Sequence, residues 1–338
     1  MSATSPGPDA LLRIASGFMT AKVLLTASSL GLFSELAERP LTGDELRARL
    51  TLHPRSAHDF LDTLVALGLL ERTDGTYANT PATARYLVRG EPTYLGGFLE
   101  MTDARMYGLW GRLEAALRTG EPQNEIESGD EDIYATLYAD PDRLAAFQQA
   151  MTGLSMGSIL ALVDAIDWSP YRTVADIGCA EGFLLTRLLR RHPHLRGTGF
   201  DLSAVAPGFQ QRLAESGLTD RLAFRAGDFF TEPLPQADVL IFGHILSNWD
   251  LPTCRTLLRK AHEALPDGGL VVIYETLLDD DRRENVDGLL MSLTMLLETP
   301  GGFEYTGADC RGWLADAGFR ESHVRHLAGP ESMVIGRK

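Results

Sequence analysis

The sequence predicts an α/β fold in two parts: a mostly helical N-terminal part and a C-terminal part built on an open, mainly parallel sheet. A strand, glycine turn, helix and strand follow one another at residues 173–201. Further apolar strand-like runs come after it, at 222–228, 237–243 and 270–274. Residues 11–118 instead carry apolar side chains mainly at helical spacing.

The unit at 173–201 is the strongest local pattern. Thr173–Ile177 is a short apolar, β-branched run that suits a buried parallel strand, and Gly178 and Gly182 interrupt the chain after it. A leucine-rich helix and a second strand ending at Asp201 follow. In such a unit the glycines let a ligand approach backbone N–H groups, and an acid about 20 residues further on can bind ribose hydroxyls. The middle glycine of the dinucleotide fingerprint is absent here. The two remaining glycines would also suit a turn that only packs a helix on a sheet.

The later strands weaken that simpler interpretation. The third run ends in Gly227-Asp228-Phe229, the fourth ends at Gly243, and the fifth follows a turn at 266–269. Acids at the carboxyl ends of the first three strands would meet at the ligand crevice of an open α/β sheet. The order of these elements therefore favours a nucleotide-type ligand.

Four successive motifs resemble those of the S-adenosylmethionine-dependent small-molecule O-methyltransferases, in particular the bacterial secondary-metabolism relatives of the plant phenolic enzymes. The motifs are Asp176-Ile-Gly-Cys-Ala-Glu-Gly182, Phe200-Asp-Leu202, Gly227-Asp-Phe-Phe230 and Ile245-Leu-Ser-Asn-Trp249. The resemblance covers nearly the whole chain. It implies a class I (Rossmann-like) methyltransferase sheet of seven strands, a winged-helix-like N-terminal dimerisation domain, and S-adenosyl-L-methionine as cofactor. The five parallel strands and a terminal hairpin at 320–336 would supply the seven strands.

The expected division has three parts. Residues 1–120 form a helical, winged-helix-like dimerisation and lid domain, 121–168 a linker and connecting helix, and 169–338 the S-adenosylmethionine-binding catalytic domain. The winged-helix pattern alone would suggest a DNA-binding module. However, its helix at 56–67 carries Asp59 and Asp62 and neither Lys nor Arg, whereas phosphate binding needs basic groups. Dimerisation is therefore the favoured role.

Composition excludes several other classes of partner. The formal net charge of −15 over 338 residues argues against nucleic acids and anionic membrane surfaces. The three cysteines, Cys179, Cys254 and Cys310, show neither a metal-ligand spacing nor a disulfide framework. No signal-like N-terminal segment or uninterrupted apolar run of about 18 residues is present. We therefore expect a soluble, cytoplasmic protein.

The resemblance assigns the cofactor site residue by residue. Asp201 should accept the ribose hydroxyls, Asp228 and Phe229 should meet the adenine, and the loop at 176–182 should approach the methionine part. For Asp228 a turn-capping role is the structural alternative. The predicted cofactor-binding residues are Asp176, Gly178, Gly182, Asp201, Leu202, Asp228, Phe229 and Gly243.

The catalytic position departs from the family pattern. Relatives carry a histidine in a motif like Leu-His-Asp-Trp, which removes the proton of a phenol that is only about 0.1% ionised at neutral pH. Here the matching run is Leu246-Ser-Asn-Trp249, so Ser247 and Asn248 replace the histidine and its acid. Glu275 and Glu304 match the two acids that orient the histidine in relatives, and here they have no evident imidazole to orient. A serine cannot replace imidazole as a base.

Three explanations remain open. In the first, alignment of the acceptor alone drives transfer. In the second, His244 acts as a displaced base, although a simpler role for it is a hydrogen-bonded packing residue beside the cofactor. In the third, the enzyme methylates carbon or catalyses another reaction. The predicted catalytic-pocket residues are Ser247, Asn248, Glu275, Glu304 and His244. Core packing accounts for most of the large side chains at 94–118, but the resemblance implies a helical lid there, so some of Phe98, Met101, Tyr107 and Trp110 should line the pocket.

No metal site is predicted. A related group of C-methyltransferases holds iron with two histidines, and these positions correspond to Ser247 and Thr299 here. The pairs His192/His194 and His323/His326 have a loosely ligand-like spacing, but their expected locations favour surface roles.

The sequence therefore predicts a homodimeric, S-adenosylmethionine-dependent methyltransferase of a small aromatic, polyketide-derived or amino-acid-derived metabolite. O-methylation by proximity and orientation is favoured. The enzymatic alternative is C-methylation of an enolisable or aromatic carbon, with Glu275 or Glu304 assisting deprotonation. The non-enzymatic alternative is a ligand-binding or regulatory relative that has lost methyl transfer.

Overall fold

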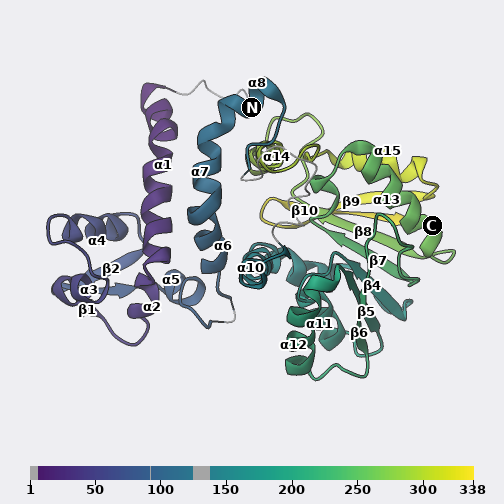
Figure 1. Cartoon of the computed structure of the whole chain (residues 1–338), viewed down its shortest axis with the longest axis horizontal. Helices are drawn as coiled ribbons and strands as arrows, with labels where there is room; N and C mark the ends of the chain where they lie inside the picture. Colours follow the sequence, from purple (N-terminus) through teal and green to yellow (C-terminus); the bar gives the residue numbers. More distant parts are fainter. Residues whose placement is uncertain (1–6, 92, 125–137) are drawn as a thin grey trace. The chain divides into compact units, whose positions relative to one another are not determined.

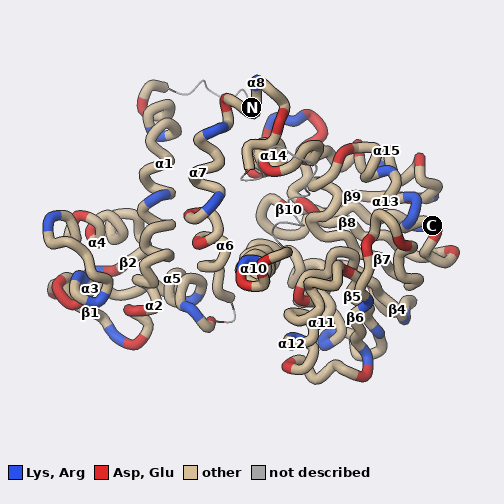
Figure 2. Tube along the Cα trace, in the orientation of Figure 1, with Lys and Arg blue, Asp and Glu red and all other residues tan. Residues whose placement is uncertain are grey.

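The computed structural model describes residues 7–91, 93–124 and 138–338, which form two compact units. Unit 1 comprises Met1–Gly108 with Gln149–Leu154, and unit 2 comprises Leu109–Gln148 with Ser155–Lys338. One long helix, α10, contributes residues to both (Figure 1). Lysine, arginine, aspartate and glutamate are interspersed over the elements of both units (Figure 2).

Unit 1 combines helices with a small antiparallel sheet of strand order β1-β3-β2. Its core consists mainly of leucines, with Phe33 and Tyr77. The elements from its N-terminus are α1 (Pro8–Ser29), α2 (Leu32–Glu35), β1 (Leu41–Thr42), α3 (Gly43–Arg49), α4 (Ala57–Ala66), β2 (Leu70–Thr73), β3 (Thr76–Asn79), α5 (Pro81–Tyr86), α6 (Gly96–Met101), a π-helical turn (Thr102–Met106) and α7 (Tyr107–Leu109).

Local signals in unit 1 were largely correct. The residues Thr42-Gly-Asp-Glu45 form a capping box at the start of α3: the Thr42 hydroxyl accepts a hydrogen bond from the Glu45 N–H at 3.2 Å, and the Glu45 carboxylate accepts one from the Thr42 N–H at 2.7 Å. Strands β2 and β3 form the hairpin of the winged-helix pattern. The short β1 was not predicted, because two residues are too few to show a periodicity.

Asp62 of α4 is bound to the neighbouring hairpin. The Asp62 carboxylate accepts a hydrogen bond from the Tyr77 hydroxyl at 2.7 Å and pairs with Arg72 of β2. These contacts fasten the helix to the hairpin. The helix that would read DNA in a winged-helix module is thus committed to packing within its own unit.

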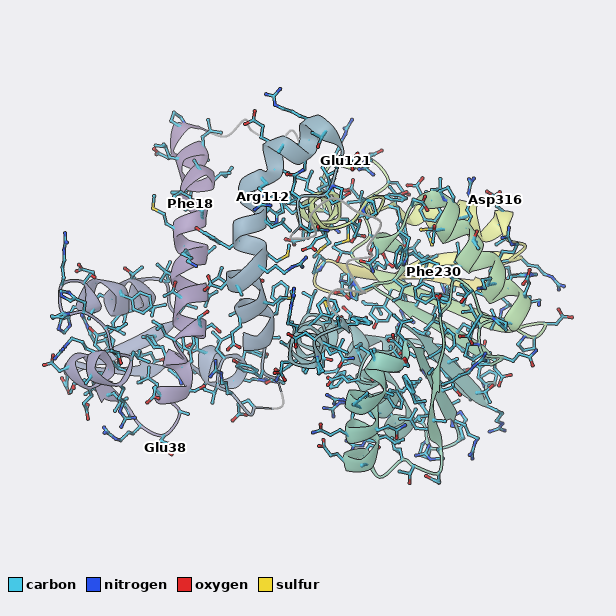
Figure 3. All side chains as sticks on the ribbon, in the orientation of Figure 1. Phe18, Glu38, Arg112, Glu121, Phe230 and Asp316 are labelled. Atoms are coloured by element: carbon cyan, nitrogen blue, oxygen red, sulfur yellow. The ribbon has the colours of Figure 1, made fainter. Side chains whose placement is uncertain are left out.

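Helix α1 leaves an apolar face uncovered. Leu12, Ile14, Phe18 and Met19 are each more than half exposed, and Phe18, labelled in Figure 3, reaches 57%. By length and composition alone α1 and α10 could each cross a membrane, with only 11% of the most apolar window of α1 buried, against 44% for α10. A helix that packs inside a protein passes the same test. An exposed face of this kind indicates a contact surface.

The predicted helical stretch at 94–118 is interrupted rather than continuous. The π-helical turn separates α6 from α7, and a 3₁₀ turn (Trp110–Arg112) precedes α8 (Leu113–Thr119). Asp103 of the π-helical turn pairs with Lys22 of α1 and accepts a hydrogen bond from Ser29 at 3.0 Å. The four expected lid residues are partly buried, and their role toward a substrate remains a prediction.

Unit 2 contains the predicted seven-stranded sheet, with strand order β6-β5-β4-β7-β8-β10-β9. Strands β4 to β8 pair in parallel, and β10 is antiparallel to β8 and β9. The remaining elements are α10 (Pro141–Ala165), β4 (Thr173–Ile177), α11 (Phe183–Arg191), β5 (Arg196–Asp201), a 3₁₀ turn (Ser203–Val205), α12 (Ala206–Ser216), β6 (Leu222–Ala226), β7 (Val239–Gly243), a 3₁₀ turn η4 (Leu246–Asn248), α13 (Leu251–Ala264), β8 (Leu270–Glu275), α14 (Val286–Glu298), α15 (Gly307–Asp316), β9 (Glu321–Ala328) and β10 (Glu331–Arg337).

Each face of the sheet carries its own hydrophobic core. Helices α10, α11 and α12 cover one face, and α13 and α15 cover the other (Figure 1). Strands β7 and β8 are therefore almost continuously buried, as their apolar sequence predicts. The sheet order reverses at β4, because β5 lies on one side of it and β7 on the other. The carboxyl ends of these strands diverge there, which is where open α/β sheets bind ligands.

Candidate functional site

The glycine turn after β4 requires its glycines. Gly178 and Gly182 have φ angles of +74° and +79°, a region that L side chains rarely adopt. A Cβ at Gly178 would lie 2.3 Å from the Cδ1 atom of Ile245, and one at Gly182 would lie 2.6 Å from the ring of Phe209. The turn therefore packs against both α12 and the loop after β7. Both interpretations of the motif, helix packing and close ligand approach, are compatible with this geometry.

Asp201 fastens this turn from the end of β5. Its two carboxylate oxygens accept hydrogen bonds from the Ala180 N–H at 2.9 Å and from the Leu202 N–H at 2.7 Å. Each oxygen keeps a further acceptor position, so ribose hydroxyls can still bind. Burial raises the pKa of Asp201 to about 6, although the two backbone hydrogen bonds act in the opposite direction.

Asp176 lies under the turn, 5% exposed, on β4. Burial, together with the nearby charge of Asp201, raises the pKa of Asp176 to about 7. The two acids thus form a pair that resists full ionisation, since like charges at close range oppose each other. A cationic ligand, such as one carrying a sulfonium and an ammonium group, would favour the ionised pair.

Asp228 serves as a turn cap. Its carboxylate accepts hydrogen bonds from the Phe230 N–H at 2.8 Å and the Thr231 hydroxyl at 3.0 Å. Beside it the Phe229 ring packs edge-on against Phe230 and Trp249, with ring centroids 4.6 and 6.1 Å away. The capping role does not remove Asp228 from the predicted adenine site, because the cap fixes the backbone that presents Phe229.

Gly243 leaves room for a neighbouring side chain. A Cβ there would lie 2.1 Å from the Cζ atom of Tyr274. The Tyr274 ring is buried, and burial raises its pKa well above the ordinary value, with the charges of Asp176, Glu331 and Glu275 adding to the effect. Space for Tyr274 is therefore a structural reason for a glycine at this position, beside the predicted contact with the cofactor.

Glu275, at the end of β8, is fully buried and holds the loop that carries the predicted catalytic position. Its Oε1 atom accepts hydrogen bonds from the backbone N–H groups of Ile245 at 3.1 Å, Leu246 at 2.8 Å and Ser247 at 3.3 Å. The carboxylate thus occupies the N-terminal end of η4, where backbone N–H groups lack helical partners. The sequence left Glu275 without an evident task, and the structure assigns it this one.

Ser247 and Asn248 are held within the same loop. Ser247 is 4% exposed, and its carbonyl oxygen accepts a hydrogen bond from the Phe303 N–H at 2.8 Å. The Asn248 amide donates to the His244 carbonyl oxygen at 2.7 Å, which ties the loop across its own turn. Neither residue can accept a proton at neutral pH. Thr299 corresponds to the second iron-binding histidine of the related C-methyltransferases. Its hydroxyl accepts a hydrogen bond from the Gly302 N–H at 2.8 Å.

Glu304 is 2% exposed, and its Oε2 atom makes no hydrogen bond within the described residues. Burial raises the pKa of Glu304 well above its ordinary value, and the neighbouring Glu275 and Glu331 raise it further. Burial without a hydrogen-bond partner thus favours the protonated form of this carboxyl group.

His244 follows β7 with a φ angle of +54°. Its Nε2 atom lies 3.3 Å from the Oε1 atom of Glu331, a buried acid at the start of β10. Sequence analysis missed Glu331. The available signal was an acid that opens an otherwise apolar strand.

The pair His192/His194 was predicted not to bind a metal ion. The Nε2 atoms of His192 and His194 each contact a backbone carbonyl oxygen at 3.0 Å, those of Val163 and Trp168. These rings therefore help to pack the end of α11. Over the described ranges, no group of three or more His, Cys, Asp or Glu residues is arranged to hold a metal ion.

Comparison with known proteins identifies the family of this fold. A profile of O-methyltransferase domains matches residues 110–320, and one of O-methyltransferase dimerisation domains matches residues 12–89. The chain belongs to the O-methyltransferase family. It is an S-adenosylmethionine-dependent methyltransferase of small metabolites, and the glycine turn with its acids suits that cofactor.

Three proteins illustrate the similarity. The tetracenomycin polyketide synthesis 8-O-methyl transferase TcmO of Streptomyces glaucescens is 44% identical, over 98% of this chain and 97% of its own. The N,N-dimethyltransferase OxyT of Streptomyces rimosus is 38% identical, over 94% and 92%. The crystal structure of human N-acetylserotonin methyltransferase in complex with S-adenosylmethionine superposes with a TM-score of 0.91 at 29% identity, over 99% of both chains.

The first prediction concerns the buried hydrogen bonds that Glu275 accepts from backbone N–H groups. Replacing it by alanine leaves three backbone N–H groups without their acceptor, so Glu275→Ala should lower the free energy of unfolding by about 2 kcal/mol. Glu275→Gln, which keeps one oxygen acceptor, should lose less than Glu275→Ala. Urea denaturation measures both, with the exposed Glu263→Ala as control. Equal stability of Glu275→Ala and the native protein would contradict this role.

The second prediction concerns Asp176. Its pKa is about 7 in the folded chain against 3.8 when exposed. The folded state therefore keeps a proton that the unfolded state loses, and the stability of the cofactor-free protein should fall between about pH 4 and pH 7. Asp176→Asn should flatten this decline, by at most about 4 kcal/mol. Urea denaturation at several pH values tests it, with the exposed Asp267→Asn as control. An unchanged pH dependence in Asp176→Asn would be inconsistent with the assignment.

Proposed function

We propose that this protein methylates a hydroxyl oxygen of a small aromatic, polyketide-derived metabolite by proximity and orientation, without the usual catalytic histidine. The observation that carries the proposal is the state of the catalytic loop. Ser247 occupies the base position, is buried, and lies in a backbone that Glu275 holds at consecutive N–H groups. The loop that presents the acceptor is thus preorganised although its base is missing.

The cofactor, when bound, supplies a methyl group that is already activated on a sulfonium sulfur. Asp201 would accept the ribose hydroxyls, Phe229 would lie against the adenine, and the turn at 178–182 would present its backbone to the methionine part. Asp176 would stabilise the cation through the turn. Holding two reactants in line can supply several kcal/mol of the activation barrier, because orientation is settled before the reaction.

The names of the relatives support an aromatic polyketide acceptor. TcmO is described as acting in tetracenomycin polyketide synthesis, and it resembles this chain over almost its whole length. OxyT is named an N,N-dimethyltransferase. Since transfer by alignment does not depend on a base at position 247, an amine is the second candidate acceptor, and acceptor panels should include one.

The N-terminal domain supports a homodimer. The dimerisation profile covers residues 12–89, and the exposed side chains of α1 fall largely inside that range. Burying them against a second copy would remove this apolar face from water. A cytoplasmic location completes the proposal, since Cys179, Cys254 and Cys310 are all free and buried.

The third prediction tests the catalytic proposal. The native protein should methylate at least one hydroxynaphthalene or hydroxyanthraquinone, and Ser247→His should change kcat by less than about 10-fold, because alignment already drives transfer. Ser247→Ala provides the matched control, since it removes the hydroxyl without adding an imidazole. Methyl transfer is measured by mass spectrometry. Inert native protein with an active Ser247→His variant would overturn the proposal, whereas loss of S-adenosylmethionine binding in calorimetry would contradict enzymatic function altogether.

The fourth prediction tests the dimer. The double change Ile14→Asp with Phe18→Asp places two charges on the exposed face of α1 and should produce monomers, because an interface cannot bury unpaired carboxylates cheaply. Light scattering after size-exclusion chromatography gives the mass. Val286→Asp, at a position 61% exposed on α14, should leave the dimer unchanged. A dimeric double variant would place the interface elsewhere.

A further inference from the structure

A histidine and a glutamate form an enclosed pair at the carboxyl end of β7. The His244 Nε2 atom lies 3.3 Å from the Glu331 Oε1 atom, and the two side chains are 20% and 6% exposed. They come from different strands, β7 and β10, with β8 between them in the sheet. The antiparallel return of β10 is what brings Glu331 to the ligand-binding edge.

The backbone and ring of His244 are both fixed. Its N–H donates to the Tyr274 carbonyl oxygen at 3.1 Å, and its own carbonyl oxygen accepts from the Asn248 amide. The ring stands edge-on to Tyr274, with centroids 5.4 Å apart. A left-handed backbone at a non-glycine residue, as here, costs free energy and often occurs where function requires it.

The two ring nitrogens have different surroundings. Nε2 is buried, lies 3.3 Å from the Glu331 Oε1 atom, and makes no hydrogen bond within the described residues. Nδ1 has no hydrogen bond to any part of the chain that the structure describes, and it is not among the buried polar atoms without partners. The ring therefore faces a carboxylate at ion-pair distance on one side and is accessible on the other, which suits an imidazole whose protonated form a carboxylate stabilises.

The other groups of this cluster cannot accept a proton from an acceptor. Glu275 has its oxygens committed to backbone N–H groups, the pKa of the buried Glu304 carboxyl is raised by burial and neighbouring acids, and the Tyr274 hydroxyl is buried with a strongly raised pKa. Ser247 is not a base at neutral pH. Among these neighbours, His244 alone combines a titratable nitrogen with an accessible side.

We propose that His244 replaces the missing histidine as proton acceptor, and that Glu331 is the positioning residue that orients its ring. The inference rests on the proposed function and names the destination of the acceptor's proton. The O–H bond of the acceptor breaks and its proton passes to Nδ1. The acceptor oxygen forms the new O–CH₃ bond, the electron pair of the broken S–CH₃ bond stays on sulfur, and the imidazolium later releases its proton to solvent.

The charges around His244 set the expected pH dependence. Glu331 faces it from β10, Glu275 and Tyr274 from β8, Asp176 lies near Tyr274 on β4, and Glu304 lies in the loop before α15. Burial opposes protonation of the ring, but the close contact with the Glu331 carboxylate, with the charges of Glu331 and Glu275, outweighs it and raises the pKa of His244. Since the neutral imidazole is the active form, kcat should rise as pH passes upward through this pKa.

The experiment compares two acceptors of different acidity, 1-naphthol and 4-nitro-1-naphthol, in the native protein, His244→Gln and Glu331→Gln. His244→Gln should lower kcat for 1-naphthol by about 100-fold or more. It should lower kcat for the nitro compound far less, because that hydroxyl is already ionised at neutral pH. Glu331→Gln should move the acid limb of kcat to lower pH by about 1 unit, since a carboxylate no longer favours the charged ring.

Two further readouts do not depend on turnover. The His244 ring resonance, assigned by its absence in His244→Gln, should titrate about 1 unit lower in Glu331→Gln than in the native protein bound to S-adenosylhomocysteine. Calorimetry should show S-adenosylmethionine affinity within about 3-fold of native in both variants, because neither residue is assigned to the cofactor. The exposed His323→Gln and Glu321→Gln changes on β9 are matched controls and should leave every readout unchanged.

Several outcomes would contradict the roles assigned to His244 and Glu331. An unchanged kcat and acid limb in His244→Gln would remove its role as proton acceptor. Loss of cofactor affinity with unaltered kcat would make His244 a cofactor contact instead. A ring pKa unaffected by Glu331→Gln would remove the positioning role. Native protein inactive on every acceptor would refute the proposed function, and the pair with it, before any variant is made.

Discussion

The carboxylate of Glu275 is the contact on which the catalytic region depends. A fully buried charge is costly unless it is satisfied, and here consecutive backbone N–H groups of residues 245–247 satisfy it. The same contact fixes the loop after β7. Through Ile245 the loop packs against Gly178 of the cofactor turn, and through the Ser247 carbonyl it holds the chain at Phe303. One buried acid therefore links the end of β8 to the predicted sites of both reactants.

Unit 2 holds several buried acids. Asp176 and Asp201 lie under the glycine turn, and Glu275, Glu304 and Glu331 lie beside the loop after β7. Burial raises the pKa of Asp176, Asp201, Glu275 and Glu304, and buried acids oppose stability when ionised. A cationic cofactor at the first group and an imidazole at the second would offset part of this cost. The arrangement is thus typical of a site whose stability is exchanged for binding and chemistry.

The resemblance predicts that Ser247 stands at the position of the family histidine and that Glu275 and Glu304 correspond to the acids beside it. In this structure Glu275 binds backbone, Glu304 is a buried carboxyl whose pKa is raised, and a third acid, Glu331, faces His244. Proximity and a displaced proton acceptor are compatible, because alignment lowers the barrier to transfer while the proton still requires a destination.

The sequence by itself determined the sheet, the glycine turn and the family. Buried parallel strands require unbroken apolar runs, as at 239–243 and 270–275, and a left-handed turn requires glycine at 178 and 182. These are local demands, so one chain displays them. Only the tertiary structure decided which acids meet which donors. The contacts of Glu275 with the loop after β7 and of Glu331 with His244 depend on the order and direction of strands, above all on the antiparallel return of β10. The periodicity of the sequence cannot predict such contacts, because the partners are far apart along the chain.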